Sequence, residues 1–213
     1  MIKELRARGV RDERVLAAME EVPRRAFVAK PVMQGQAYKG TALPIGADQT
    51  ISQPYTVART CELLELDSHH SVLEIGTGTG YHTAVLSRLA ARVYSLERVH
   101  ELSREAIRRI RELGIDNVKI QTFDGTVGWS EVGPFDRILV TAGAPSAPRP
   151  LLEQLKPGGR LLVPEGRTGE QRLVLYSFQG DRVIRQLGEK VSFVPLIGRY
   201  GWASPEAADE GKS

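Results

Sequence analysis

The fold is decided by the stretch Leu73-Glu74-Ile75-Gly76-Thr77-Gly78-Thr79-Gly80, which lies where a short apolar strand is predicted to meet a helix. Glycines at such a junction let the backbone turn sharply and approach a ligand closely. The dinucleotide pattern Gly-x-Gly-x-x-Gly would need a glycine where this chain has Tyr81, and its third glycine is Gly80 instead. Glu74 precedes the first glycine, and a carboxylate there disfavours a pyrophosphate but accommodates an amine-bearing ligand such as a methionine moiety.

Strands and helices alternate around this stretch. The predicted strands are residues 71–75, 92–96, 117–122, 135–141 and 160–164, and the predicted helices begin at Pro54 and cover residues 81–90, 100–113 and 148–155. This alternation predicts an α/β fold with a mostly parallel central sheet and helices on both faces. After Pro164 it stops, and residues 172–178 and 182–187 flank Gln179-Gly180-Asp181, which predicts a C-terminal β-hairpin.

The N-terminal part of the chain has a different pattern. Residues 1–30 are predicted to form short helices, with Asp12 as an N-cap. Residues 31–53 show no clean period, yet they carry enough apolar side chains to be ordered. We therefore expect one domain over residues 1–203. Its parts are an N-terminal helical and substrate-segment extension (1–53), a cofactor-binding core (54–164) and a C-terminal β region (165–203), followed by a disordered tail (204–213).

Composition excludes several functional classes. Hydrophobic residues make up 41% of the 213 residues and charged residues 26%, values that are typical of globular proteins. No apolar run reaches membrane-span length and the N-terminus lacks a signal-peptide core, so we expect a cytoplasmic protein. A net charge of +3 is too small to indicate nucleic-acid binding, and the arginines of residues 104–111 are expected on a solvated helix face. We expect no membrane partner, and a monomer.

No metal site is expected. Cys61 is the only cysteine and is predicted to be a small buried residue on a helix. The histidines have no metal-ligand spacing. His69 and His70 are expected at the surface before the first strand, and His82 and His100 at helix-surface positions.

Three further features follow predicted strands. Glu97 lies near the spacing, about 20 residues after the glycines, at which α/β nucleotide folds place a ribose-binding carboxylate. Asp124-Gly125 follows the third strand and, taken alone, indicates a turn. The segment Lys156-Pro157-Gly158-Gly159 predicts a turn before the fifth strand.

These features resemble motif I and its neighbours in the class I methyltransferases. More specific segments resemble the protein-L-isoaspartate O-methyltransferase family, in order from about residue 3 to 197: Val22–Val28, Ala42–Gly46, Gln49–Tyr55, Val140–Ala142 and Phe193–Leu196. The chain departs from the family pattern at Phe123, where glycine is usual, at Thr56, where methionine is common, and slightly at Gly143-Ala144 and Glu165. None of these departures removes a polar group that the chemistry needs.

The resemblance implies a Rossmann-like class I methyltransferase fold. It also implies methyl transfer from S-adenosyl-L-methionine to the free α-carboxylate of L-isoaspartyl, and D-aspartyl, residues in damaged proteins and peptides. Ser52 occupies the family's active-site position. The implied acceptor-binding residues are Thr50, Ile51, Ser52, Gln53, Pro54, Ala142, Val194 and Pro195. The implied cofactor-binding residues are Tyr55, Glu74, Gly76, Thr77, Gly78, Gly80, Glu97, Asp124, Gly125 and Thr141, where Asp124 would accept from the adenine amine.

A carboxylate acceptor fits the acceptor segment physically. It is ionised at neutral pH, so its methylation needs no general base. Residues 49–55 offer the hydroxyls of Thr50 and Ser52 but no lysine or arginine, and they end at a predicted helix start whose N–H groups attract an anion. From spacing alone, Ser52 is also a candidate helix cap.

Two other functions stay open at this stage. A class I methyltransferase acting on a small molecule or RNA would share the glycine stretch but would not need Thr50-Ile51-Ser52. A noncatalytic nucleotide- or protein-binding module on the same fold is the second alternative, because fold alone does not decide function.

Overall fold

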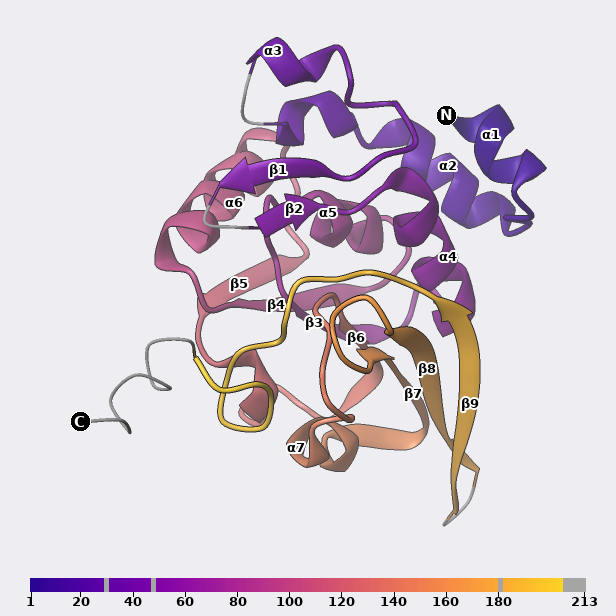
Figure 1. The fold of residues 1–213 in the computed structure, drawn as a ribbon, viewed down its shortest axis with the longest axis vertical. Coiled ribbons are helices and arrows are strands. Elements are labelled where there is room, and N and C mark those ends of the chain that lie inside the picture. Colours follow the sequence, from indigo (N-terminus) through magenta and orange to yellow (C-terminus); the bar gives the residue numbers. More distant parts are fainter. Residues whose placement is uncertain (29–30, 47–48, 180–181, 205–213) are drawn as a thin grey trace.

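The computed structural model describes residues 1–28, 31–46, 49–179 and 182–204. Its centre is a seven-stranded sheet of order β5-β4-β3-β6-β7-β8-β9 (Figure 1). The strands are β3 (Ser71–Ile75), β4 (Arg92–Glu97), β5 (Val118–Thr122), β6 (Phe135–Val140), β7 (Leu155–Glu165), β8 (Arg172–Gln179) and β9 (Arg182–Lys190). The first five are parallel, and β8 and β9 join antiparallel, which confirms the predicted parallel sheet and C-terminal hairpin.

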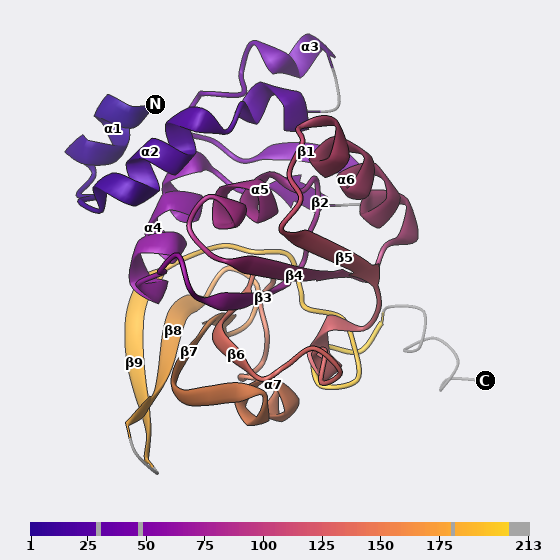
Figure 2. The ribbon, with the colours of Figure 1, turned by 180° about the vertical axis from the view of Figure 1, so that it is seen from behind.

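Helices cover both faces of this sheet, as expected. The main helices are α4 (Pro54–Leu64), α5 (Tyr81–Ser87), α6 (His100–Glu112) and α7 (Arg149–Glu153). Alternate residues of β6 separate into two clusters: Leu139 packs with α4, α5 and α6, and Ile138 packs with α7. Figure 2 shows α6 beside β5, with α5 over β4. In the described ranges, no helix has the length and apolar character needed to cross a membrane.

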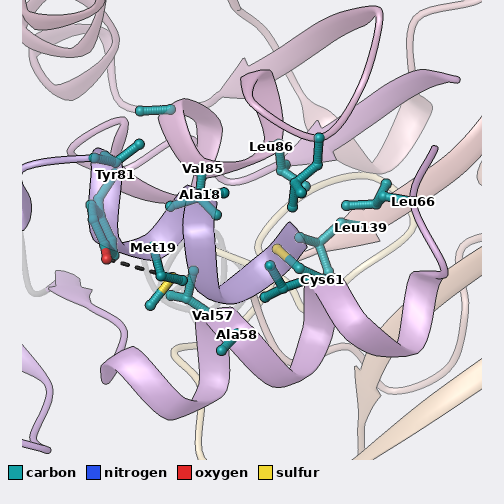
Figure 3. Close-up of a cluster of buried hydrophobic side chains, with 14 of the residues drawn as sticks. Ala18, Met19, Val57, Ala58, Cys61, Leu66, Tyr81, Val85, Leu86 and Leu139 are labelled. Carbon is teal, nitrogen blue, oxygen red and sulfur yellow. Dashed lines mark hydrogen bonds between the residues drawn. The ribbon is translucent and has the colours of Figure 1, made fainter. Parts of the chain in front are cut away.

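An N-terminal layer packs on the outside of α4 and α5. It contains α1 (Ile2–Ala7), α2 (Glu13–Glu21), the 3-10 turn η1 (Arg24–Phe27) and α3 (Pro31–Gln34). Asp12 is the N-cap of α2, as predicted, and its side chain accepts from the Arg14 amide at 2.9 Å. Met19 of α2 reaches the Tyr81 hydroxyl at 3.6 Å, and Figure 3 shows it in one cluster with side chains of α4, α5 and β6. Cys61 is fully buried in this cluster, which confirms its predicted place.

The segment predicted to be irregular contains a small sheet. Its strands β1 (Leu43–Gly46) and β2 (Gln49–Ile51) pair antiparallel. Leu43 and Ile51 face each other across the pair and are both buried in the core. This contact with the rest of the protein stabilises strands too short to show a periodic pattern in the sequence.

Several element boundaries differ from the prediction. Helix α5 ends at Ser87 rather than residue 90, because the Asn117 side chain donates to the carbonyls of Ser87 and Ala90 at 2.9 and 3.1 Å. Strand β5 begins at Val118, one residue later than predicted. The expected turn at residues 156–159 is a bulge inside β7, where the register jumps from Leu155 to Arg160. The hairpin turn at 180–181 and the tail at 205–213 lie outside the described residues.

One of the positions predicted at the surface was wrong. His70 is 7% exposed, and its Nδ1 accepts from the Asp67 amide at 2.9 Å, so it closes the turn into β3. On α6, the helix buries a narrow stripe that contains Leu102, Ala106 and Ile110, and it leaves Ile107 at 36% exposure. His69 and His100 are exposed, as predicted.

The segment after β9 returns across the carboxyl edge of the sheet. Gln171, at 1% exposure, donates from Nε2 to the Phe193 carbonyl at 3.0 Å and accepts from the Phe193 amide at 2.6 Å. The Gly143 amide donates to the Val194 carbonyl at 2.7 Å, and the Leu196 amide donates to the Gly143 carbonyl at 2.8 Å. The buried side-chain amide of Gln171 and the backbone of Gly143 therefore hold residues 191–196 in place.

We expect Gln171→Ala to loosen this segment without unfolding the sheet. Loss of a buried partner costs about 1–3 kcal/mol, so exchange of the Phe193 amide with solvent should accelerate by about 10- to 100-fold. Hydrogen exchange followed by NMR measures this, with Leu73 in β3 as the internal reference. Gln186→Ala, at an exposed position of β9, is the control variant. An unchanged Phe193 rate would contradict the assignment.

Candidate active site

A cavity of about 730 Å³ opens at the carboxyl ends of β3, β4 and β6. Strand β3 lies between β4 on one side and β6 on the other. The chain continues from β3 to β4 and β5 and then returns to the far side of β3 with β6, so the strand order reverses at this point. Open α/β sheets bind ligands in the crevice at such a reversal. The predicted site residues on its wall are Thr50, Ile51, Ser52, Gln53, Tyr55, Gly76, Thr77, Gly78, Glu97, Gly125, Thr141, Ala142, Val194 and Pro195.

The glycine loop brings the ends of β3 and β6 together. Gly76 has φ +98°, and a Cβ there would lie 2.3 Å from Thr141 Oγ1. That hydroxyl is 2.9 Å from the Ile75 carbonyl and 2.7 Å from the Gly76 carbonyl. Gly80, by contrast, faces Ala106 of α6 and does not line the cavity. The loop packs against α6 at this glycine, and its contact with the cofactor stays a prediction.

Glu97 stands on the cavity wall at the end of β4. It is 6% exposed, and its Oε2 accepts from the Gly78 amide and its Oε1 from the Val99 amide, each at 2.9 Å. Because a carboxylate oxygen has two lone pairs, each oxygen keeps capacity for a further donor. Glu97 can thus shape the loop and still accept from a ligand hydroxyl.

The structure does not place Glu74 on the cavity wall, where a direct contact with the cofactor was expected. Glu74 is fully buried and absent from the cavity wall, which its neighbours Ile75 and Gly76 form. Strand alternation turns it under the loop, where its Oε2 accepts from Thr83 Oγ1 at 2.5 Å and Ser95 Oγ at 2.6 Å. Burial raises the pKa of Glu74 to about 7.

Asp124 also differs from its expected place. Its Oδ1 accepts from the Thr126 amide at 2.9 Å and the Thr126 hydroxyl at 2.7 Å, and its Oδ2 accepts from the Arg199 amide at 2.8 Å. The carboxylate thus caps the 3-10 turn η2 (Gly125–Val127) and holds the C-terminal loop. Gly125 lies on the cavity wall and Asp124 does not, and the contact of Asp124 with adenine stays a prediction.

The acceptor segment reaches the same cavity. Gln53 is the N-cap of α4 and no side chain caps this helix, so the alternative that Ser52 is its cap is wrong. Pro54 occupies the first turn of α4 and, unlike its neighbours, does not line the cavity. Ser52 is half-buried on the wall.

Sequence reasoning missed a charged group at this cavity. Glu189 of β9 accepts from the Tyr55 hydroxyl and from Arg59 Nε, both at 3.3 Å. Arg59 Nη1 also pairs with Glu62 at 2.6 Å, and the guanidinium of Arg8 lies 3.7 Å from the centre of the Tyr55 ring. These side chains come from α1, α4 and β9, so no local motif could have grouped them.

His82 lies on the cavity wall but not on a helix surface, which corrects the sequence prediction. It is 9% exposed, and its Nε2 is 3.3 Å from Thr60 Oγ1 and 3.5 Å from Cys61 Sγ. Burial lowers the pKa of His82 to about 3, so its ring is neutral at physiological pH.

Comparisons with known proteins identify the family of this chain. The family model for protein-L-isoaspartate(D-aspartate) O-methyltransferase matches residues 1–201. A Geobacter metallireducens protein-L-isoaspartate O-methyltransferase is 51% identical over 201 residues, covering 94% of this chain and 93% of that protein. A Pelobacter propionicus protein-L-isoaspartate O-methyltransferase 2 is 52% identical, covering 94% of this chain and 89% of that protein.

Solved structures extend the comparison. One protein-L-isoaspartate O-methyltransferase superposes with a TM-score of 0.86 at 32% identity, covering 94% of this chain and 66% of that chain. A Plasmodium falciparum structure, described as a beta-aspartate methyltransferase in complex with S-adenosyl-L-homocysteine, has a TM-score of 0.81 at 27% identity. It covers 92% of this chain and 96% of that chain. Sequence and fold therefore agree over almost the whole length, and the chain belongs to the protein-L-isoaspartate(D-aspartate) O-methyltransferase family.

Proposed function

We propose that this chain methylates the free α-carboxylate of L-isoaspartyl residues, and of D-aspartyl residues, in damaged proteins and peptides, with S-adenosyl-L-methionine as the methyl donor. One observation carries the proposal: a single cavity is lined both by the glycine loop with Glu97 and by residues 50–53 with Ser52. Donor and acceptor groups bound to these two walls would share one enclosed space. Most of the rate can then come from positioning and desolvation.

The residues present fit the methyl donor. When bound, S-adenosyl-L-methionine supplies an electrophilic methyl group on a sulfonium. The absent side chain at Gly76 leaves room for close approach of a ligand to the backbone, and Glu97 keeps lone pairs for ribose hydroxyls. The residues that we propose to hold the donor are Tyr55, Gly76, Thr77, Gly78, Glu97, Gly125 and Thr141.

The acceptor wall is suited to a carboxylate that is already ionised. Thr50 and Ser52 offer hydroxyls and no charge, so they orient the group without neutralising it. No residue needs to remove a proton, and the neutral, buried His82 is not required as a base. Ile51, Gln53, Ala142, Val194 and Pro195 complete the proposed acceptor wall.

The assay that tests this function compares two isomeric peptides. Methyl ester formation is expected on an isoaspartyl peptide and not on the same peptide with a normal aspartyl residue. Equal rates on both peptides, or methylation of RNA or a small molecule in their place, would contradict the proposal. A third peptide, with D-aspartate at the same position, tests the wider substrate range.

Three finer features of the function stay proposals. We infer a monomer, because one chain supplies both walls of the cavity. The cytoplasmic location rests on the composition of the sequence and stays a prediction. We also infer that residues 1–53 and 165–203 contribute mainly to the acceptor side, and residues 54–164 mainly to the cofactor side, of one domain.

Glu97→Ala should weaken cofactor binding strongly. Loss of two hydrogen bonds to a carboxylate is expected to cost about 2–4 kcal/mol of affinity. The Gly78 amide of the loop would also lose the carboxylate to which it donates. Calorimetric titration with S-adenosylhomocysteine measures the effect. The control is Glu101→Ala, which removes an exposed acid four residues further along the chain. An unchanged dissociation constant in the folded variant would remove Glu97 from the site.

Ser52→Ala should lower turnover on isoaspartyl peptides by about 10- to 100-fold. This loss is no larger than the one caused by removing a single oxyanion-hole donor from an enzyme. Cofactor affinity should barely change, because the lost hydrogen bond belongs to the acceptor. No histidine or lysine adjoins Ser52 in sequence to activate it, so we expect the hydroxyl to position the carboxylate and not to act as a nucleophile. Steady-state kinetics, with cofactor binding measured separately, tests whether turnover falls while cofactor affinity stays the same. A trapped methyl-serine intermediate would overturn this mechanism.

A further inference from the structure

Glu74 is a buried carboxyl group that has no role in the proposed methyl transfer. It is fully buried, and its only hydrogen-bond partners among the described residues are the hydroxyls of Thr83 and Ser95. Both bonds go to Oε2, and Oε1 has no hydrogen-bond partner. An unpaired carboxylate in such a position is expensive.

No cation within the described chain offsets this charge. Glu74 takes part in none of the ion pairs formed by the described residues, and the other acid that acts on it is Glu97 on β4, which raises its pKa further. From α4, Cys61 faces it as a neutral thiol, because burial raises the pKa of Cys61. On α5, His82 is uncharged, and on β6 the paired residue is the apolar Leu139.

The group nevertheless lies directly beneath the cofactor wall. Its chain neighbours Ile75 and Gly76 line the cavity. Ser95 Oγ, which bonds to Glu74, is also 2.6 Å from Thr77 Oγ1, and Thr77 lines the cavity too. A positive charge in the cavity would therefore be separated from Glu74 by one layer of loop residues.

The methyl donor and its product differ by one such charge. S-adenosylmethionine carries a sulfonium cation, whereas S-adenosylhomocysteine is the neutral thioether with the same adenosine and amino-acid groups. We propose, on the basis of the function proposed above, that the uncompensated Glu74 is a positioning residue that favours the cationic methyl donor over the neutral product without touching either. The preference would promote exchange of product for a new donor after each turnover.

A purely structural role for Glu74 makes a different prediction. If the carboxylate only held the loop through Ser95 and Thr83, its loss would weaken both ligands equally, because they share every group that contacts the loop. A charge effect changes the ratio of the two affinities. A unit charge about 10 Å from its partner, at an effective dielectric constant of about 20, alters that ratio by about tenfold.

The test is calorimetric titration of the full chain with each ligand, without acceptor peptide, at about pH 8, where Glu74 is mostly ionised. We expect Glu74→Gln to weaken S-adenosylmethionine by about tenfold and S-adenosylhomocysteine by less than about twofold. Thr83→Ser removes a buried methyl group beneath the loop but keeps the hydroxyl that donates to Glu74, so it should preserve the charge and the wild-type ratio. Equal losses for both ligands in Glu74→Gln, or the same ratio change in Thr83→Ser, would overturn the proposal.

The wild-type protein provides a second measurement that needs no variant. Because the pKa of Glu74 is about 7, its charge is present above that pH and lost below it. The preference for the sulfonium should therefore shrink as the pH falls from about 8 to about 6, and a flat ratio would contradict the charge effect. If neither ligand binds the wild-type chain, the proposed function itself fails, and this inference with it.

Discussion

The close approach of Gly76 to Thr141 is the contact on which the rest of the site depends. Strands β3 and β6 run side by side, but the chain leaves them in opposite directions, toward α5 and toward the loop that carries Gly143. A side chain at Gly76 would displace the Thr141 hydroxyl, which is within hydrogen-bond distance of the Ile75 and Gly76 carbonyls. Without that contact the two strand ends would separate and the crevice between them would lose its floor.

The sheet was predictable from sequence because its signals are local. Apolar runs of strand length alternate with helical periods, and Asp12 precedes α2 as a cap should. The prediction failed where burial comes from distant segments. Every residue of α5 is buried, because α2 and α4 cover the face that would otherwise meet solvent, so His82 lacks the surface position that an isolated helix would give it.

The two acids near the glycine loop show the limit of motif reasoning. Glu74 and Glu97 both lie at the carboxyl end of a strand, and both were expected to contact the cofactor. Strand alternation places Glu74 inside β3 with its side chain turned under the loop, whereas Glu97 is the last residue of β4 and reaches the wall. The position of each acid within its strand, and not its distance from the glycines, decides its role. Glu97 can bind ribose directly, whereas Glu74 can act on a ligand only through long-range electrostatics.

The proposed acceptor wall includes segments outside residues 54–164. Ser52 follows β2, and Arg8 and Glu189 arrive from the two ends of the chain. The arginine that lies closest in sequence to the acceptor segment, Arg59, is compensated by Glu62 and Glu189. An uncompensated guanidinium would bind the acceptor carboxylate more tightly, but it would also withdraw the negative charge that attacks the methyl group. With Arg59 paired to acids and neutral hydroxyls facing the proposed acceptor, the carboxylate would keep its nucleophilic charge.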